Sequence, residues 1–168
     1  LQECKRAWAR EGEDYSYGEL MERAAAAAPS ATVLDLDEFM SPGNHPRRIV
    51  EYCHKTGQQP PEDAGSITRL ILHSLAVRYK QVLELLEQLT GREIKVIHIV
   101  GGGSRNRLLN QLAADVTGRR VIAGPAEATA AGNALTQALG TGTIGSLEEL
   151  RAIVRQSFQV EEFVASKL

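Results

Sequence analysis

The feature that most constrains this chain is an apolar strand pattern that runs directly into three glycines and a helix. Residues 95–100 (KVIHIV) predict a strand buried on both faces. Three glycines and Ser104 follow, and Ser104 is expected to cap a helix over residues 104–116. Residues 119–123 (RRVIA) predict a second strand, and residues 127–139 predict a helix of small residues. Strand–helix–strand–helix indicates a parallel strand pair with a right-handed crossover, and hence an α/β fold.

The glycine run has a chemistry of its own. Glycines accept positive φ angles and carry no side chain, so the backbone N–H groups of Gly101, Gly102 and Gly103 can approach a ligand closely. The start of the following helix adds a partial positive charge. The pattern therefore favours a phosphate-binding site. A tight strand-to-helix turn that binds nothing is the alternative, but three successive glycines lower stability more than such a turn requires.

Two common nucleotide motifs do not fit this segment. A Walker loop ends in Gly-Lys-Ser/Thr, which is absent here. A dinucleotide-binding motif needs a third glycine where Asn106 stands, and an acidic residue near the end of the next strand. That strand instead ends in Ala123-Gly124-Pro125, with no acid before Glu127. A dinucleotide-dependent oxidoreductase is therefore disfavoured.

The first ninety residues are predicted to form helices and one short strand. Helices are expected over residues 1–10, 17–28, 46–56 and 66–90, with Ser16 capping the second and Gly91 ending the last. The helix over residues 66–90 carries a wide apolar stripe. Residues 32–40 are expected to include a short strand. A further helix over residues 146–156 should begin at Ser146.

Composition excludes several classes of function. A net charge of −2 gives no general attraction to nucleic acid or to anionic membranes. No apolar stretch approaches the roughly 18 residues of a membrane helix. The two cysteines, Cys4 and Cys53, form no disulfide framework or metal-ligand spacing, which favours a cytoplasmic location. The chain opens at Leu1 inside a helical pattern, so a preceding segment is expected.

Residues 97–135 (IHIVGGGSRNRLLNQLAADVTGRRVIAGPAEATAAGNAL) resemble the C-terminal domain of the FGGY carbohydrate kinases. The resemblance extends upstream through LQECKRAW, SPGNHPRRIVEYCHKTGQ and the long helix, and it covers nearly the whole chain. It implies one of two actin-like (ribonuclease H-like) ATPase domains, which transfer the γ-phosphoryl group of Mg-ATP to a sugar hydroxyl. We therefore expect residues 1–168 to be the C-terminal nucleotide-binding domain, without its opening strands, and ATP and Mg²⁺ as cofactors.

The same resemblance implies specific contacts. Gly101, Gly102 and Gly103 match the family's glycine motif beside the nucleotide, with Gly102 in its middle. Asn106 matches an asparagine that contacts the adenine end, and Gln2 matches a glutamine at the nucleotide site. The L-rhamnulose kinases of this family carry the most similar residues. This implies L-rhamnulose, phosphorylated at O1, as the sugar substrate of the intact enzyme.

The chain lacks other parts of the family pattern. The family's aspartate base, its first phosphate loop and most of its sugar contacts lie in the N-terminal domain, and nothing here matches them. We therefore expect no catalytic residue and no metal ligand in this chain, the N-terminal domain of the same kinase as its partner, and no activity from the chain alone. A catalytically inert nucleotide-binding or interaction module of the same fold is the alternative.

Four further side chains have two interpretations each. Glu127 is expected to cap the helix that it opens, with orientation of the nucleotide cleft as the alternative. His98 is expected to be a core histidine of its buried strand rather than a catalyst. Arg105 and Arg107, beside the glycines, either help to hold phosphate or face solvent.

Overall fold

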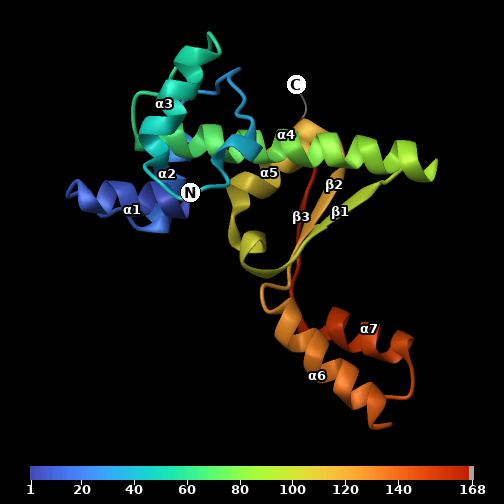
Figure 1. Cartoon of the computed structure of the whole chain (residues 1–168). Coiled ribbons are helices and arrows are strands. Elements are labelled where there is room, and N and C mark those ends of the chain that lie inside the picture. Colours follow the sequence, from blue (N-terminus) through green and yellow to red (C-terminus); the bar gives the residue numbers. More distant parts are fainter. Residues whose placement is uncertain (167–168) are drawn as a thin grey trace. The chain divides into compact units, whose positions relative to one another are not determined.

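The computed structural model describes residues 1–166 and divides into two compact units (Figure 1). The first unit comprises Leu1–Leu85, and the second begins at Leu86. One long helix, α4 (Ala64–Thr90), runs from the first unit into the second. Among the described residues, no helix has both the length and the apolar character that a membrane span requires.

The first unit is helical. Its elements are α1 (Gln2–Arg10), α2 (Tyr17–Ala26), the 3₁₀ turn η1 (Leu36–Phe39), α3 (His45–Lys55) and most of α4. Its core contains Cys4, Trp8, Leu20, Leu34, Ile49, Cys53, Ala64, Ile67, Leu70 and Ile71. The four helices expected in this unit are confirmed, with shifts of one or two residues at some of their ends. Ser16 caps α2 as predicted, because its Oγ accepts from the Glu19 N–H at 3.1 Å while Glu19 Oε2 accepts from the Ser16 N–H at 2.7 Å.

The prediction of a short strand within residues 32–40 is wrong. This segment is irregular and ends in η1. Side chains from other elements occupy its backbone donors: Ser74 Oγ accepts from the Leu34 N–H at 3.0 Å, and Tyr52 OH accepts from the Asp35 N–H at 3.1 Å. Because side chains satisfy these N–H groups, the segment stays buried in part without pairing to a strand.

The second unit contains a three-stranded sheet in the order β1-β2-β3. The strands are β1 (Val96–Ile99), β2 (Arg120–Ala123) and β3 (Glu161–Phe163). The expected parallel pair is confirmed: β1 pairs with β2 in parallel, and α5 (Arg107–Thr117) connects them and packs on β2. Strand β3, which the sequence did not predict, pairs antiparallel with β2. Figure 1 shows the three strands side by side.

Burial of β1 on both faces is not observed. In the described residues β1 pairs only with β2, so it is an edge strand. The face covered by α5 carries Val121 and Phe163, which are buried, whereas His98 and Val100 are exposed. The expectation of a core histidine at position 98 is therefore wrong, because the described chain places no second layer over that face of β1.

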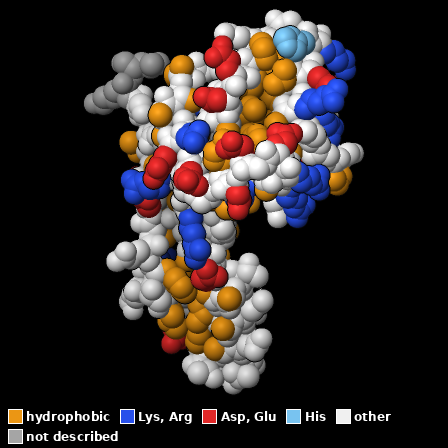
Figure 2. Space-filling model, turned by 90° about the vertical axis from the view of Figure 1, so that its left-hand side faces the viewer, with side chains coloured by type: hydrophobic (Ala, Val, Ile, Leu, Met, Phe, Trp, Pro, Cys, Tyr) orange, Lys and Arg blue, Asp and Glu red, His pale blue; other side chains and the backbone are white. Residues whose placement is uncertain are grey.

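The chain after β2 forms a helical hairpin of α6 (Ala128–Gly140) and α7 (Leu147–Ser157), which pack on each other. The predicted cap of α7 is confirmed, since Ser146 Oγ accepts from the Glu149 N–H at 3.1 Å. The small residues of α6 leave open surface: Ala130 is exposed, and a Cβ at Gly132 would meet no atom within 4 Å. Figure 2 shows apolar side chains gathered on this hairpin.

Candidate nucleotide site

The ends of the two parallel strands are tied together. The Gly101 N–H donates to the Pro125 carbonyl at 3.0 Å, and the Gly124 N–H donates to the Ile99 carbonyl at 2.8 Å. The glycine turn after β1 and the loop after β2 therefore lie side by side. Ligands of parallel α/β sheets commonly bind at this carboxyl edge.

The glycine segment forms its own short helix. Residues Gly101–Arg105 make a 3₁₀ turn, η2, and α5 begins only at Arg107. Asn106 is the N-cap, because its Oδ1 accepts from the Leu109 N–H at 3.0 Å. The expectation that Ser104 caps α5 is wrong: Ser104 lies inside η2, where its Oγ donates to the Gly101 carbonyl at 2.7 Å. The 3₁₀ turn ends at the hydrogen bond from the Asn106 N–H to the Gly103 carbonyl, at 3.1 Å. The cap of α5 therefore lies two residues later than expected, at Asn106 instead of Ser104.

The three glycines have different reasons to be glycine. Gly101 has a φ of +73°, a conformation that disfavours a side chain. Gly102 and Gly103 have no such backbone angle. A Cβ on Gly102 would meet nothing within 4 Å, and one on Gly103 would make an ordinary contact of 3.6 Å with Ile99. The fold of the described chain therefore requires only Gly101, and the other two glycines leave open surface over the turn.

That open surface presents backbone donors. In a 3₁₀ helix each N–H group pairs with the carbonyl three residues earlier, so the N–H groups of Gly101 and Gly102, the first two residues of η2, have no partner inside it. Of them, the Gly101 N–H is already occupied by Pro125. The N–H group of Gly102 therefore lies on a bare stretch of backbone that fits the close approach of an anionic group.

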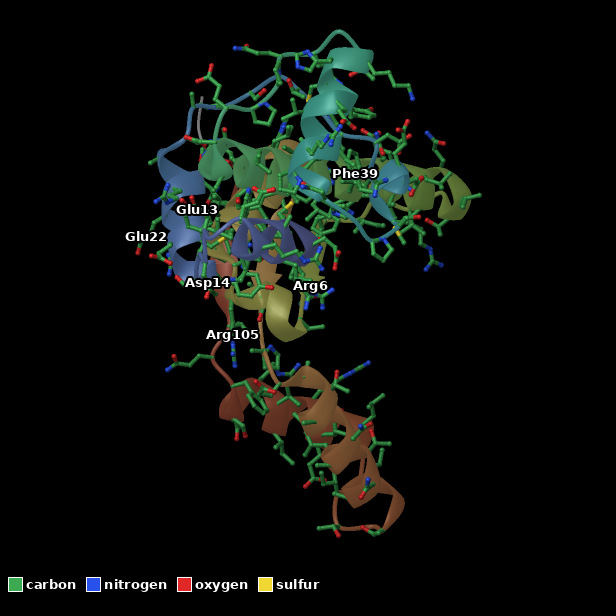
Figure 3. The ribbon with its side chains drawn as sticks, turned by 60° about the vertical axis from the view of Figure 1, so that its left-hand side comes forward. Arg6, Glu13, Asp14, Glu22, Phe39 and Arg105 are labelled. Carbon is green, nitrogen blue, oxygen red and sulfur yellow. The ribbon has the colours of Figure 1, made fainter. Side chains whose placement is uncertain are left out.

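An ion pair joins this turn to the start of α6. Glu127 stands at the N-cap position of α6, but its side chain makes no capping bond. Glu127 Oε1 instead accepts from Arg105 Nη2 at 2.8 Å, and Figure 3 shows Arg105 extending from the turn. The expected position of Glu127 at the start of α6 is confirmed, but its carboxylate makes no capping hydrogen bond there. Its partner lies 22 residues away in sequence.

The second arginine beside the glycines points elsewhere. Arg107 Nη1 pairs with Glu161 Oε1 at 2.7 Å, and its guanidinium lies 5.9 Å from the centre of the Phe163 ring. Both partners belong to β3. Arg107 is thus engaged on the sheet rather than by the glycine turn.

The structure brings four of the five predicted site residues together. Gly101, Gly102, Gly103 and Asn106 all lie in η2 or directly after it. The Asn106 side chain is half-buried, with its oxygen used as the cap of α5. Gln2 is the first residue of α1, is exposed, and belongs to the first unit. Its place at the nucleotide site stays a prediction.

One residue of this region was missed by the sequence analysis. Asn110 lies on α5, is fully buried, and donates from Nδ2 to the Ser104 carbonyl at 2.9 Å. Its Oδ1 has no hydrogen-bond partner among the described residues. A buried polar atom left unpaired costs about 1–3 kcal/mol. The signal in the sequence was a polar side chain next to Leu109 on the inward face of a helix.

No metal site accompanies the turn within residues 1–166. No group of three or more His, Cys, Asp or Glu side chains there is arranged to hold a metal ion. The described part of the site consists of backbone donors, amide side chains and one exposed ion pair.

Comparison with known proteins gives a consistent result. The model for "FGGY family of carbohydrate kinases, C-terminal domain" matches residues 1–141. A rhamnulokinase of Bacteroides thetaiotaomicron is 41% identical over 97% of this chain and 33% of its own length. A rhamnulokinase of Bacillus subtilis is 40% identical over 89% of this chain and 31% of its own length. The chain thus spans about a third of the length of these curated relatives.

A solved structure agrees in fold. The crystal structure of xylulose kinase from Rhodospirillum rubrum matches 95% of this chain and 32% of that chain, with a TM-score of 0.60 and 20% sequence identity. At that identity the likeness establishes the fold alone. The expected α/β class, with the actin-like ATPase fold of the sugar kinases, is confirmed.

Proposed function

This chain belongs to the FGGY family of carbohydrate kinases, and from this membership we propose that it supplies the nucleotide-binding side of an ATP-dependent sugar kinase. The observation that carries the proposal is the bare turn at the carboxyl edge of the parallel strands. Neither Gly102 nor Gly103 is required by the fold of the described chain, and the Gly102 N–H group has no partner within the turn itself. A ligand that approaches the backbone there accounts for both glycines.

We assign the following roles within the turn. Gly101 makes the bend, and Gly102 and Gly103 face the nucleotide. Asn106 holds its oxygen toward Leu109, which leaves the amide nitrogen as the donor for the adenine end of ATP. Gln2 is proposed as a further contact of the nucleotide.

Phosphoryl transfer relies on positioning and electrostatic stabilisation rather than on covalent chemistry by the protein. The part of these residues is to bind and orient the nucleotide whose γ-phosphoryl group is transferred. The base that deprotonates the sugar hydroxyl is proposed to come from an N-terminal domain of the same kinase. The described residues offer no ligand cluster for Mg²⁺, so its ligands are assigned to that domain and to the phosphates.

The proposed acceptor is L-rhamnulose, phosphorylated at O1. Support comes from the two relatives named rhamnulokinases, which are 41% and 40% identical to this chain over most of its length. The cytoplasm is the proposed location, supported by two cysteines that are both free and buried.

The test is a coupled assay of ADP release by the full-length kinase, with Mg-ATP and either L-rhamnulose or D-xylulose. We expect turnover with L-rhamnulose and much less with D-xylulose. The 168-residue chain assayed alongside should show no sugar-dependent turnover. Nucleotide binding without turnover on any sugar by the full-length protein would instead identify an inert nucleotide-binding module.

A further inference from the structure

A single buried amide anchors the end of the glycine turn. Asn110 is fully buried on α5, one helical turn after the cap residue Asn106. Its Nδ2 donates to the Ser104 carbonyl at 2.9 Å, while its Oδ1 accepts no hydrogen bond from the described residues. The residue therefore makes one of the four hydrogen bonds that its amide can make, in a fully buried position.

An apolar residue of similar volume would avoid that unpaired oxygen. Asn110 is surrounded on α5 by buried apolar positions, Leu109, Ala113 and Ala114. What distinguishes asparagine from leucine at this position is the one hydrogen bond to Ser104. The reversed amide orientation would place Oδ1 against a carbonyl oxygen, where neither atom can donate, so the observed orientation is the only one that satisfies Ser104.

This bond completes a clamp on the turn. At its start, the Gly101 N–H is held by the Pro125 carbonyl. At its end, the Ser104 carbonyl is held by Asn110. Gly102 and Gly103 lie between these two anchors, and a Cβ at Gly102 would meet no atom within 4 Å. The backbone that is proposed to meet the nucleotide has few contacts of its own and depends on the anchors at its two ends.

We infer that Asn110 is a positioning residue for nucleotide binding: through the Ser104 carbonyl it holds the Gly102–Gly103 backbone in the geometry that receives ATP. This inference rests on the proposed function. Asn110 acts through the turn and does not touch the ligand. Its removal should therefore change the ATP constant and the conformation of the turn, and leave the sugar constant alone.

The experiment compares Asn110→Leu with Leu109→Ala in the full-length kinase. Asn110→Leu keeps the number and branching of the side-chain heavy atoms and removes both the bond and the unpaired oxygen. It should raise the KM for ATP about three- to tenfold, the loss of one hydrogen bond, with kcat at saturating ATP, the KM for sugar and the unfolding temperature little changed. Leu109→Ala, at a buried neighbour that makes no side-chain bond to the turn, should lower the unfolding temperature and spare the KM for ATP. If Asn110→Leu does not fold, Asn110→Ala takes its place.

A second readout does not depend on catalysis. In the full-length kinase labelled with ¹⁵N-glycine, Asn110→Leu should shift or broaden the amide signals of Gly101, Gly102 and Gly103 and leave that of Gly142, beyond the far end of α6, unmoved. Unmoved turn signals, or an equal rise in the ATP KM from Leu109→Ala, would overturn the inference. A wild-type protein that neither binds ATP nor phosphorylates sugar would overturn the proposed function instead, whatever the glycine signals show.

Discussion

Arg105 and Glu127 form an ion pair, with 2.8 Å between Nη2 and Oε1, that joins the end of the glycine turn to the first residue before α6. The pair connects the two loops that leave the carboxyl edge of the parallel strands. Both side chains are about 70% exposed, at 71% and 70%. Solvent therefore screens their attraction, and the pair is better suited to orienting the loops than to stabilising the fold.

The first prediction follows from that exposure. A double-mutant cycle of Arg105→Ala and Glu127→Ala should give a coupling free energy of about 0.2–1 kcal/mol in low salt, measured by urea unfolding. The coupling should fall toward zero in 1 M salt, because the screening length then shrinks to about 3 Å. A coupling above 2 kcal/mol that persists in high salt would contradict the screened geometry.

The second prediction separates the ligand role of Gly102 from its role in the fold. Gly102→Val places a side chain in open space, so the unfolding temperature should change little while ATP binding weakens by about 1–3 kcal/mol, the loss of hydrogen bonds to a charged group. Calorimetric titration with ATP and a thermal melt measure the two effects. Gly140→Val is the matched control: it also meets no atom within 4 Å, has no positive φ, and lies at the end of α6.

Substitution of Gly101, unlike that of Gly102, should affect the stability of the fold. Its φ of +73° means that Gly101→Ala should lower the free energy of unfolding by about 1–2 kcal/mol.

A folded Gly102→Val variant with normal ATP affinity would refute the assignment of the turn as a nucleotide site.

The third prediction concerns the two ends of the Asn106 amide. Asn106→Ala should cost about 1 kcal/mol of stability by removing the cap of α5, and it should raise the KM for ATP. Asn106→Asp keeps the capping oxygen and removes the NH₂ donor, so stability should be retained while the KM for ATP still rises. Steady-state kinetics with each substrate varied in turn measure this. An effect on the sugar KM alone would place Asn106 elsewhere.

The fourth prediction concerns the thiols. Burial raises the pKa of Cys4 from 9.0 to about 11, and burial also raises the pKa of Cys53. Both thiols should therefore resist alkylation and disulfide exchange at pH 8 until the chain is unfolded, because the thiolate is the reactive form. A colorimetric thiol titration with and without denaturant should count none and then two. Rapid reaction of either thiol in the native protein would argue against its buried position.

The raised pKa of Cys4 also makes the stability of the fold depend on pH. Above pH 9 the unfolded Cys4 thiol loses its proton while the folded one keeps it, so stability should fall as the pH rises from about 9 toward 11. Cys4→Ser should reduce this pH dependence.

Features that depend on residues close together in the sequence could be predicted from the sequence. Ser16 caps α2, Ser146 caps α7, and Gly91 and Gly118 end their helices at φ angles of +65°. The strand–glycine–helix segment and the parallel pair were predicted for the same reason. Each rests on local backbone preferences and on the spacing of apolar residues.

Other features depended on partners far away in sequence. Residues 32–40 are not a strand because side chains such as Ser74 and Tyr52 hold their backbone. The three residues of β3 become a strand only through pairing with β2. These outcomes could not be predicted, because the sequence of each segment does not specify which distant group will pair with its backbone.

At the candidate site, too, some features were predictable from the sequence and others depended on the tertiary structure. The sequence by itself determined that a glycine turn would follow a strand and precede a helix, because glycine and the apolar pattern act locally. Only the tertiary structure decided that Asn106 rather than Ser104 caps α5, that Glu127 turns to Arg105, and that Asn110 is buried against the Ser104 carbonyl. A hydrogen bond goes to whichever partner the packed chain brings within about 3 Å, and that distance is set by the fold as a whole.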